Sequence, residues 1–297
     1  MLVDMKNLNK KKIAILGASL PMMLFAYYLK KKKIDVTIIN NSKNIGGAWQ
    51  KFKYQDLQIR KQSNIIVPVN KLEEKNQKKI NNFLKKNFFV KIKKIRKDVN
   101  ITYNVKNVFS YNFDIFLKNF IKEKILKKIL VKKIEIKNNK VKINSNYEFD
   151  LVYLPTFFGI EKIKIDDKSY KTNFKIIKSE HVVAITKAKW IGNIHYSDFF
   201  NDFFDRAQFT KHEGFYVFSG RLVKKQKGAD NKKIYKNLKK IFIKKPIIEF
   251  FKFKYKNFYR DKNDVKILKK LDKFKQIKHI DTSSFMASML NLIRYDR

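Results

Sequence analysis

The apolar positions of the chain are most concentrated near its start, within residues 12–50. A short apolar run predicts a buried strand, and the Gly-Ala-Ser sequence at 17–19 predicts a tight turn. The uncharged residues after this turn predict a helix, and a second strand is expected to end near Asn40, ahead of the glycine pair at 46–47. Strand, turn, helix and strand in this order are typical of a dinucleotide-binding βαβ unit.

Farther along, the spacing of the apolar residues changes with the kind of element that it predicts. Apolar residues recur at helical spacing over 113–130, and a lysine-rich helix is expected over 76–97. Short alternating runs within 131–149, separated by Asn-rich turns, predict a β-meander, and the apolar run 150–155 predicts a buried parallel strand. The other expected elements are an extended piece at 65–67, strands at 181–187 and 214–223, a helix at 230–243, a strand or a helix at 247–259, and a C-terminal helix with Thr282 or Ser283 as its N-cap.

Charge changes the expected partners more than the expected fold. The formal net charge is +43, from 69 Lys+Arg and 26 Asp+Glu, yet only seven of the basic residues are arginine, which leaves 62 lysines. The lysines are spread over the whole chain, and Asn, Ile, Phe and Tyr are abundant with them, as an AT-rich coding sequence would produce. We attribute the excess mainly to this bias. The positive field still favours anionic ligands.

The absence of cysteine and the apolar segment near the start limit the classes of protein to which the chain can belong. The chain has no cysteine, which excludes disulfides, thiolate metal sites and a cysteinyl-linked cofactor, and a cytoplasmic location is expected. Residues 13–29 are uncharged and follow lysines, as in a signal peptide. They fall short of the roughly 20 apolar residues that span a bilayer, and a Gly-Ala-Ser-Leu-Pro sequence interrupts them. We therefore expect no membrane span.

The turn of the βαβ unit departs from the standard dinucleotide pattern. Gly17 occupies the first glycine position, but Ser19 and Met22 occupy the second and third, and Asn40 stands where an acid binds the ribose. The Ser19 hydroxyl could donate to a phosphate, and Asn40 can hydrogen-bond a ribose hydroxyl as an uncharged partner. Met22 is expected to push the helix away from the strand.

The spacing around this turn resembles the FAD-binding start of the flavin superfamily that includes amine oxidases, phytoene desaturases and UDP-galactopyranose mutases. There, a glycine loop, a helix and a ribose-binding Glu are followed six residues later by a Gly-Gly pair. Gly17, Asn40 and the pair 46–47 fit this pattern without a gap, and Gly-Gly-Ala-Trp at 46–49 also looks like flavin monooxygenases.

The resemblance implies FAD, rather than NAD(P), as the cofactor. Residues 116–155 are similar to the later part of the FAD domain, although the family's Gly-Asp pair before the terminal helix is absent here. The cofactor-binding residues that the resemblance implies are Gly17, Ala18, Ser19, Asn40, Gly46, Gly47, Ala48, Trp49, Val131, Thr282 and Ser283.

The predicted fold class is α/β with two parts. A Rossmann-like FAD/NAD(P)-binding domain, with a parallel sheet and a β-meander, is assigned to residues 1–60, 100–160 and 270–297. A smaller α+β substrate-side or cap domain is assigned to 61–99 and 161–269. With 44% hydrophobic residues and few prolines and glycines, the chain is expected to lack a long flexible linker.

A second group of polar residues lies within 194–208. If this segment were a helix, one face would carry a histidine and three aspartates, a set that could bind a hard divalent metal; these are His195, Asp198, Asp202 and Asp205. Two Phe-Phe pairs around Asn201 favour a hairpin instead, and a plain acidic helix is a third alternative. We predict no metal site.

In the hairpin interpretation, Arg206 and Arg221 lie on strands of the substrate-side domain. There they could clamp an anionic substrate, since guanidinium groups bind carboxylate and phosphate in a bidentate manner. Salt bridges at the surface are the alternative role for both.

Three hypotheses for function remain open from the sequence. The first is an FAD-dependent oxidoreductase-like or flavin-dependent mutase-like protein that acts on a small molecule, with an anionic one favoured by the charge. The second is a degenerate, non-catalytic nucleotide-binding Rossmann protein, motivated by Ser19, Met22 and Asn40. The third is a polyanion binder, although we do not expect nucleic acid to be the partner. The sequence identifies no catalytic residue, substrate or oligomeric state.

Overall fold

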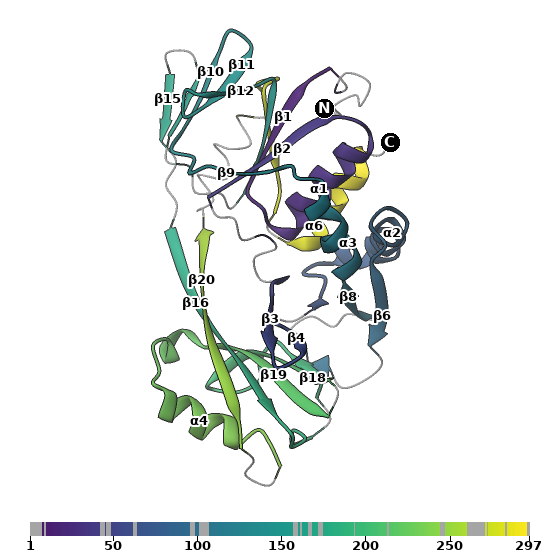
Figure 1. Ribbon diagram of the computed structural model, residues 1–297, viewed down its shortest axis with the longest axis vertical. Helices are drawn as coiled ribbons and strands as arrows, with labels where there is room; N and C mark the ends of the chain where they lie inside the picture. Colours follow the sequence, from purple (N-terminus) through teal and green to yellow (C-terminus); the bar gives the residue numbers. More distant parts are fainter. Residues whose placement is uncertain are drawn as a thin grey trace.

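The computed structural model describes residues 8, 10–41, 45, 49–61, 64–95, 99–100, 107–156, 160, 162–165, 168–171, 175–192, 194–212, 214–243, 247–259, 271, 273–282 and 284–295. Two halves are stacked along the long axis of the molecule, and a small hairpin lies between them (Figure 1).

A five-stranded parallel sheet forms the centre of the first half. Its order is β21–β13–β1–β2–β9, with β1 at the middle. The side chains of β1 alternate between two apolar cores, and all four that follow Lys12 are fully buried. A strand buried on both faces reads as a continuous apolar run, which is why this strand could be predicted. The strands are β1 Lys12–Leu16, β2 Asp35–Asn40, β9 Leu126–Lys128, β13 Leu151–Pro155 and β21 Ile277–Ile280.

Helices cover one face of this sheet. They share a single core with the β1 residues Ile13 and Ile15, and aromatic rings fill much of the space between them. Tyr27 of the first helix, for example, makes an edge-to-face contact with Phe116, their ring centroids 5.5 Å apart. The helices are α1 Leu20–Lys31, α2 Lys71–Phe88, α3 Asp114–Lys122 and α6 Phe285–Tyr295.

A second sheet, which contains the β-meander, covers the other face. Its order is β12–β11–β10–β14–β15, and its apolar side chains meet Ala14 and Leu16 of β1. The meander turns at Asn138-Asn139 and Asn144-Ser145 have positive φ, a conformation that Asn tolerates better than most residues. The strands are β10 Lys133–Lys137, β11 Lys140–Ile143, β12 Tyr147–Phe149, β14 Lys162–Ile165 and β15 Lys168–Lys171.

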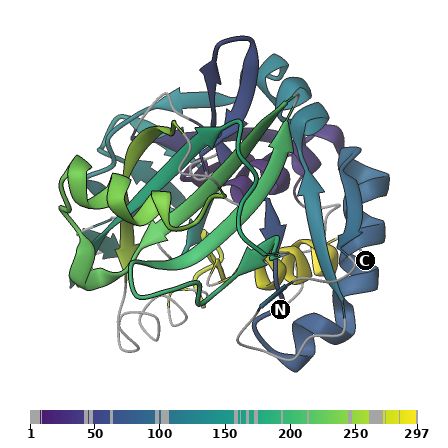
Figure 2. The ribbon, with the colours of Figure 1, turned by 90° about the horizontal axis from the view of Figure 1, so that it is seen from below.

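The second half is a six-stranded sheet, ordered β20–β16–β19–β18–β17–β7. Seen from below, its strands cross the front of the molecule, with the helix α4 against them (Figure 2). Residues of α4 share one core with this sheet, and residues of the β3–β4 hairpin share another with its opposite face. The elements are β7 Val99–Asn100, β16 Lys175–Thr186, β17 Tyr196–Ser197, β18 Phe204–His212, β19 Phe215–Leu222, η3 Lys224–Gln226, α4 Asn231–Lys239 and β20 Glu249–Tyr259.

Two smaller sheets connect the halves. The hairpin β3–β4 consists of Lys51–Tyr54 and Leu57–Arg60, and a three-stranded sheet β5–β8–β6 consists of Ile65–Ile66, Val108–Asn112 and Lys91–Ile95. The predicted fold class, α/β with a parallel sheet, a β-meander and a smaller mixed part, is confirmed. No helix within the described ranges has the length and hydropathy that crossing a bilayer requires.

Three expected elements differ from the structure. The helix expected over 113–130 ends at Lys122, and residues 126–128 instead form β9, because the open edge of β2 offers backbone groups that pair with it. The helix expected over 76–97 spans 71–88; Phe89 then takes a left-handed conformation and the chain enters β6. The ambiguous segment 247–259 contains a strand, β20.

The start of α6 also differs from the expectation. Ser284 caps the helix in place of Thr282: its Oγ accepts the Ala287 amide hydrogen at 2.9 Å. Ser283 lies outside the described residues. The Ser284 hydroxyl also donates to Glu73 Oε1 at 2.5 Å, so the beginnings of α2 and α6 are joined. Sequence pattern could not select among three adjacent hydroxyl residues, because this partner lies 211 positions away.

We predict that Ser284→Ala lowers the free energy of unfolding by about 1 kcal/mol, the usual value of an N-cap. The loss should appear as a lower urea midpoint. Ser284→Thr keeps a hydroxyl and serves as the control, with an unfolding midpoint close to that of the wild type. Equal midpoints for the alanine variant and the wild type would contradict the assignment of this cap.

Candidate functional site

The carboxyl ends of β1, β2 and β13 lie side by side where the order of the parallel sheet reverses. From β1 the sheet continues through β2 to β9 on one side and through β13 to β21 on the other. Ligands of open α/β sheets bind outside the carboxyl ends of the strands at such a point. The candidate cofactor site is therefore the turn after β1 together with the loops that follow β2 and β13.

The turn after β1 is tight and is held to the end of β2. Gly17 has φ +85°, a conformation that glycine adopts at little cost, and its amide donates to the Ile39 carbonyl at 2.8 Å. The next amide, of Ala18, donates to Asn40 Oδ1 at 3.3 Å. The structure thus brings together three of the residues that the sequence singled out, and it holds the Asn40 side chain against the turn.

The N-terminus of α1 fits an anionic group. Ser19 is its N-cap, but the Ser19 side chain makes no capping hydrogen bond, and the first turn contains no acidic residue. The partial positive charge of the helix end is therefore not balanced by a side chain of the first turn, and such an end attracts phosphate. Pro21, in the first turn, provides no amide hydrogen, so the donors at this end are the amides of the other residues. Met22, at the third glycine position, is 1% exposed and packs in the core that also contains Ile13 and Ile15.

The described residues among the remaining predicted cofactor residues lie in three connecting segments, outside the helices and strands. Trp49 packs edge-to-face on Phe113, with ring centroids 5.0 Å apart, and also contacts Phe285 at the start of α6. Val131 is buried, and its amide lies 3.4 Å from Asn41 Oδ1 in the loop after β2. Gly46, Gly47, Ala48 and Ser283 lie outside the described residues.

Thr282 connects the two strands on the far side of β1. Its amide donates to Thr156 Oγ1 at 3.1 Å, directly after β13. The Thr156 hydroxyl also lies 3.0 Å from His279 Nε2 on β21. The ends of β13 and β21 are therefore fixed to each other beside the reversal point of the sheet.

The segment 194–208 is a hairpin, as the Phe-Phe pattern predicted. β17 pairs with β18, and Asn201 Oδ1 accepts the amides of Phe203 and Phe204 in the turn. The two helical alternatives are wrong, because the segment forms a pair of strands. Within the part of the chain that the structure describes, no group of three or more His, Cys, Asp or Glu is placed to hold a metal ion.

Arg206 and Arg221 face each other across β18 and β19, but each is paired with an aspartate. Arg206 Nε lies 3.3 Å from Asp198 Oδ1, and Arg221 Nε lies 2.7 Å from Asp205 Oδ1. Burial, together with the positive charges of Arg221 and Arg206, lowers the pKa of His181 to about 3, so this side chain is neutral. The ion pairs match the salt-bridge alternative, and an anion clamp at these arginines stays a prediction.

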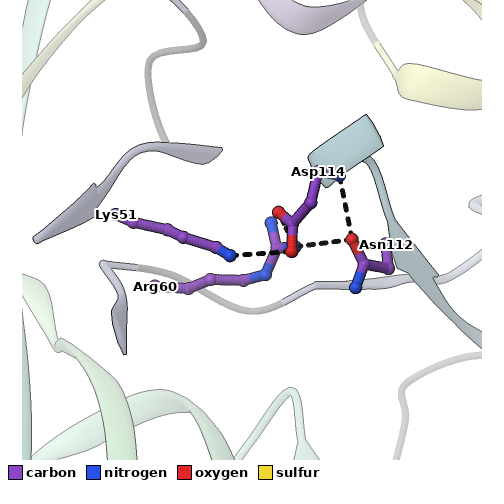
Figure 3. A network of polar contacts seen from close by, with 4 residues as sticks. All are labelled: Lys51, Arg60, Asn112 and Asp114. Carbon is purple, nitrogen blue, oxygen red and sulfur yellow. Dashed lines mark hydrogen bonds and ion pairs between the residues drawn. The ribbon is translucent and has the colours of Figure 1, made fainter. Parts of the chain in front are cut away.

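A charged cluster near the junction of the two halves was not singled out from the sequence. Figure 3 shows Lys51 of β3, Arg60 of β4, Asn112 of β8 and Asp114 of α3 converging. Lys51 Nζ lies 2.7 Å from Asp114 Oδ2, and Arg60 Nη2 lies 2.8 Å from Asp114 Oδ1. One usable sequence signal was Arg60 itself, an arginine in a chain whose basic residues are nearly all lysine.

This cluster lines a cavity of about 250 Å³. Its walls come from the β3–β4 hairpin, the start of α3 and the strands β18 and β19, which lie far apart in sequence. The cavity therefore exists only when the two halves are together. We call it the junction cavity.

The two cations of the cluster stabilise the charged form of Asp114. Burial alone would raise the pKa of the Asp114 carboxyl, but the hydrogen bond from Lys51 and the charges of Arg60 and Lys51 hold it below its usual value. Burial lowers the pKa of Arg60, partly opposed by Asp114. Arginine stays protonated in proteins even so, and Asp114 is thus a carboxylate shared by two cations.

Comparison with known proteins identifies the fold. No known family profile matches the chain, and no curated protein matches it. Among solved structures, a redesigned putrescine oxidase is similar with a TM-score of 0.64 and 7% identity, covering 96% of this chain and 97% of that one. A putative protoporphyrinogen oxidase from Exiguobacterium sp. 255-15 follows at 0.61 and 7%, covering 97% and 99%.

A CLA-producing fatty acid isomerase from P. acnes is also similar, with a TM-score of 0.56 and 9% identity over 96% of this chain and 97% of that one. At such low identity the likeness concerns the fold. It extends over both halves of the molecule and is not confined to the βαβ unit.

We predict that Asp114 contributes to stability only where it is ionised. Because its folded-state pKa lies below the ordinary value of 3.8, its contribution is present above about pH 3.8 and is lost as the pH falls through the folded-state value. Asp114→Asn should therefore lower the free energy of unfolding by roughly 1 kcal/mol at neutral pH, since the side chain is partly exposed and screened.

The measurement is urea unfolding of both proteins between pH 3 and pH 7. The difference between wild type and variant should shrink at the acid end. A difference that is constant over this range would show that the carboxylate charge is not responsible.

Proposed function

We propose that the protein binds FAD at the carboxyl edge of the parallel sheet and is a flavin-dependent oxidoreductase-like or mutase-like protein. The observation that carries the proposal is the turn at Gly17, which joins β1 to an α1 N-terminus without an acidic or capping side chain. The similarity to two oxidases over 96–97% of the chain supports it, since that similarity includes the substrate-side sheet.

The proposed roles follow the position of each residue. Gly17, Ala18 and Ser19 hold the pyrophosphate at the helix end, where amides and the helix dipole favour negative charge. Asn40 hydrogen-bonds the adenosine ribose from its place beside the Ala18 amide. When bound, the flavin supplies the transfer of hydride or electrons, and the protein supplies orientation and electrostatics.

The other cofactor residues complete this proposal. We place the adenine beside the Val131 backbone and the flavin end near Thr282 and Trp49, next to the start of α6. The roles of Gly46, Gly47, Ala48 and Ser283 rest on the sequence resemblance alone.

We also propose the division into domains that the sequence suggested. The cofactor-binding domain comprises 1–60, 100–160 and 270–297, and the substrate-side domain comprises 61–99 and 161–269. The segment 61–99 contacts both halves: α2 packs in the core of the first half, and β7 joins the sheet of the second. Substrate specificity is expected at the junction of the two.

The first test is the flavin content of a glycine variant. We expect wild-type protein to be yellow, or to bind added FAD with quenching of flavin fluorescence. Gly17→Ala should weaken FAD binding about tenfold or more, because an L-residue at positive φ costs roughly 1–2 kcal/mol and relief of this strain distorts the loop. A colourless protein that cannot be reconstituted with FAD would refute the proposal.

Gly228→Ala is the matched control for this experiment. Gly228 also has positive φ, at +79°, and an added Cβ would meet no atom within 4 Å. Both variants therefore carry comparable backbone strain, but only one lies in the proposed cofactor loop. Equal loss of FAD from both would indicate general destabilisation and count against a role for Gly17.

A second test uses a gain of affinity. Asn40→Glu should tighten FAD binding severalfold, because a charged acceptor forms hydrogen bonds about twice as strong as a neutral one. Asn41→Glu adds the same charge one position later, where the side chain faces the Val131 amide, and should not tighten binding. Fluorescence titration of FAD against the three proteins measures this. Weaker binding by the Asn40 variant would argue against ribose contact.

A further inference from the structure

The junction cavity contains an arginine with unused hydrogen-bonding capacity. Arg60 keeps only 15% of its side chain exposed, and its Nη2 is taken by Asp114 and Asn112. Its other terminal nitrogen, Nη1, is buried and has no hydrogen-bond partner among the described residues. A buried charged donor without a partner is costly, and Arg60 lines the cavity, so its guanidinium is the group that a bound anion would meet.

The balance of charge around the cavity favours an anion. Three cationic side chains line it, Lys51, Arg60 and Lys211, against one carboxylate, Asp114. Asp114 is already shared by Lys51 and Arg60 at 2.7 and 2.8 Å, so it neutralises only part of the positive charge. The exposed Lys211 and its neighbour His212 come from the opposite wall, on β18 of the substrate-side sheet.

The size of the cavity and its polar lining limit what the anion is. Its volume of about 250 Å³ corresponds to about eight water molecules, at roughly 30 Å³ each. The amides Asn64, Asn112 and Gln208 also line it. Gln208 and Asn64 bind each other, Nε2 to Oδ1 at 2.7 Å, which keeps this wall rigid.

We propose that the junction cavity is a binding site for a small, singly charged carboxylate that carries further polar groups, such as a hydroxy acid. The carboxylate accepts from the Arg60 guanidinium and is attracted by Lys211. A guanidinium suits this role because its donors lie in a plane that matches a carboxylate, whereas a lysine is a point charge. The carboxylate of Asp114 stays at the cavity and repels anions of higher charge, such as phosphate.

This site is separate from the proposed FAD site and does not depend on it. No residue that we assign to the cofactor lines the cavity. The two proposals can therefore fail independently, and the ligand measurement below is made on the purified full-length chain both with and without added FAD.

The experiment is calorimetric titration with lactate, and with propane-1,2-diol as the uncharged molecule of similar size. We expect saturable binding of lactate and none of the diol. Arg60→Gln should weaken lactate binding about 10- to 100-fold, the usual effect of removing a hydrogen bond to a charged group. Asp114→Asn should strengthen it, because the repelling carboxylate is gone and Arg60 is released.

Two further variants guard against misfolding and unspecific charge effects. Lys211→Gln removes an exposed side chain, so the protein should fold, and lactate binding should weaken severalfold. Lys140→Gln removes a lysine that is ion-paired with Asp150 on the meander sheet, away from the cavity, and should leave lactate binding unchanged.

Several results would overturn the proposal. The first is that lactate does not bind at millimolar concentration, which would indicate that water alone satisfies Arg60. The second is that the diol binds as tightly as lactate. The third is that inorganic phosphate binds more tightly than lactate. Loss of lactate binding in Arg221→Gln with retention in Arg60→Gln would move the anion site to the Arg206–Arg221 pair.

Discussion

Burial of β1 on both faces is the constraint on which the rest of the structure depends. Its side chains enter two separate cores, so the sheet must be covered by helices on one side and by the meander sheet on the other. With both faces covered, the edge at the carboxyl ends of the strands is where backbone amides can meet a ligand. The position of the candidate cofactor site thus follows from the apolar character of one short strand.

The β3–β4 hairpin links the two halves of the molecule, because its two sides make contacts of different kinds. One of its faces shares an apolar core with the six-stranded sheet, while Lys51 and Arg60 reach the start of α3 and hold Asp114. Apolar contact on one side and ion pairing on the other place the hairpin between the two halves. The junction cavity forms where this polar side meets the strands β18 and β19. Its chemistry is therefore a product of domain contact and not of a local sequence motif.

The sequence predicted those features that depend on local pattern. The βαβ unit, the meander and the 194–208 hairpin follow from apolar runs and Asn-rich turns, and each is present. Residues 126–128 could not be predicted as a strand, because their pairing with β2 outweighs a helical pattern. The hydrogen bond of Ser284 to Glu73 and the cluster around Asp114 each join distant segments. The glycine turn could be recognised in the sequence. The orientation of the Asn40 side chain toward the Ala18 amide could not, because it depends on how β1 and β2 pair in three dimensions.

The order of strands in the parallel sheet has a consequence for synthesis of the protein. The central strand β1 is made before the other strands of its sheet, but the sheet is completed by β21, and the core under α1 is closed by α6. A growing chain on the ribosome therefore carries an unfinished first half, with apolar surface uncovered, until residues 277–295 have been made. The six-stranded sheet, whose strands are β7 at 99–100 and β16 to β20 within 175–259, can pair earlier. Folding in the cell should accordingly finish at the parallel sheet that contains β1, and this half depends on protection from aggregation during translation.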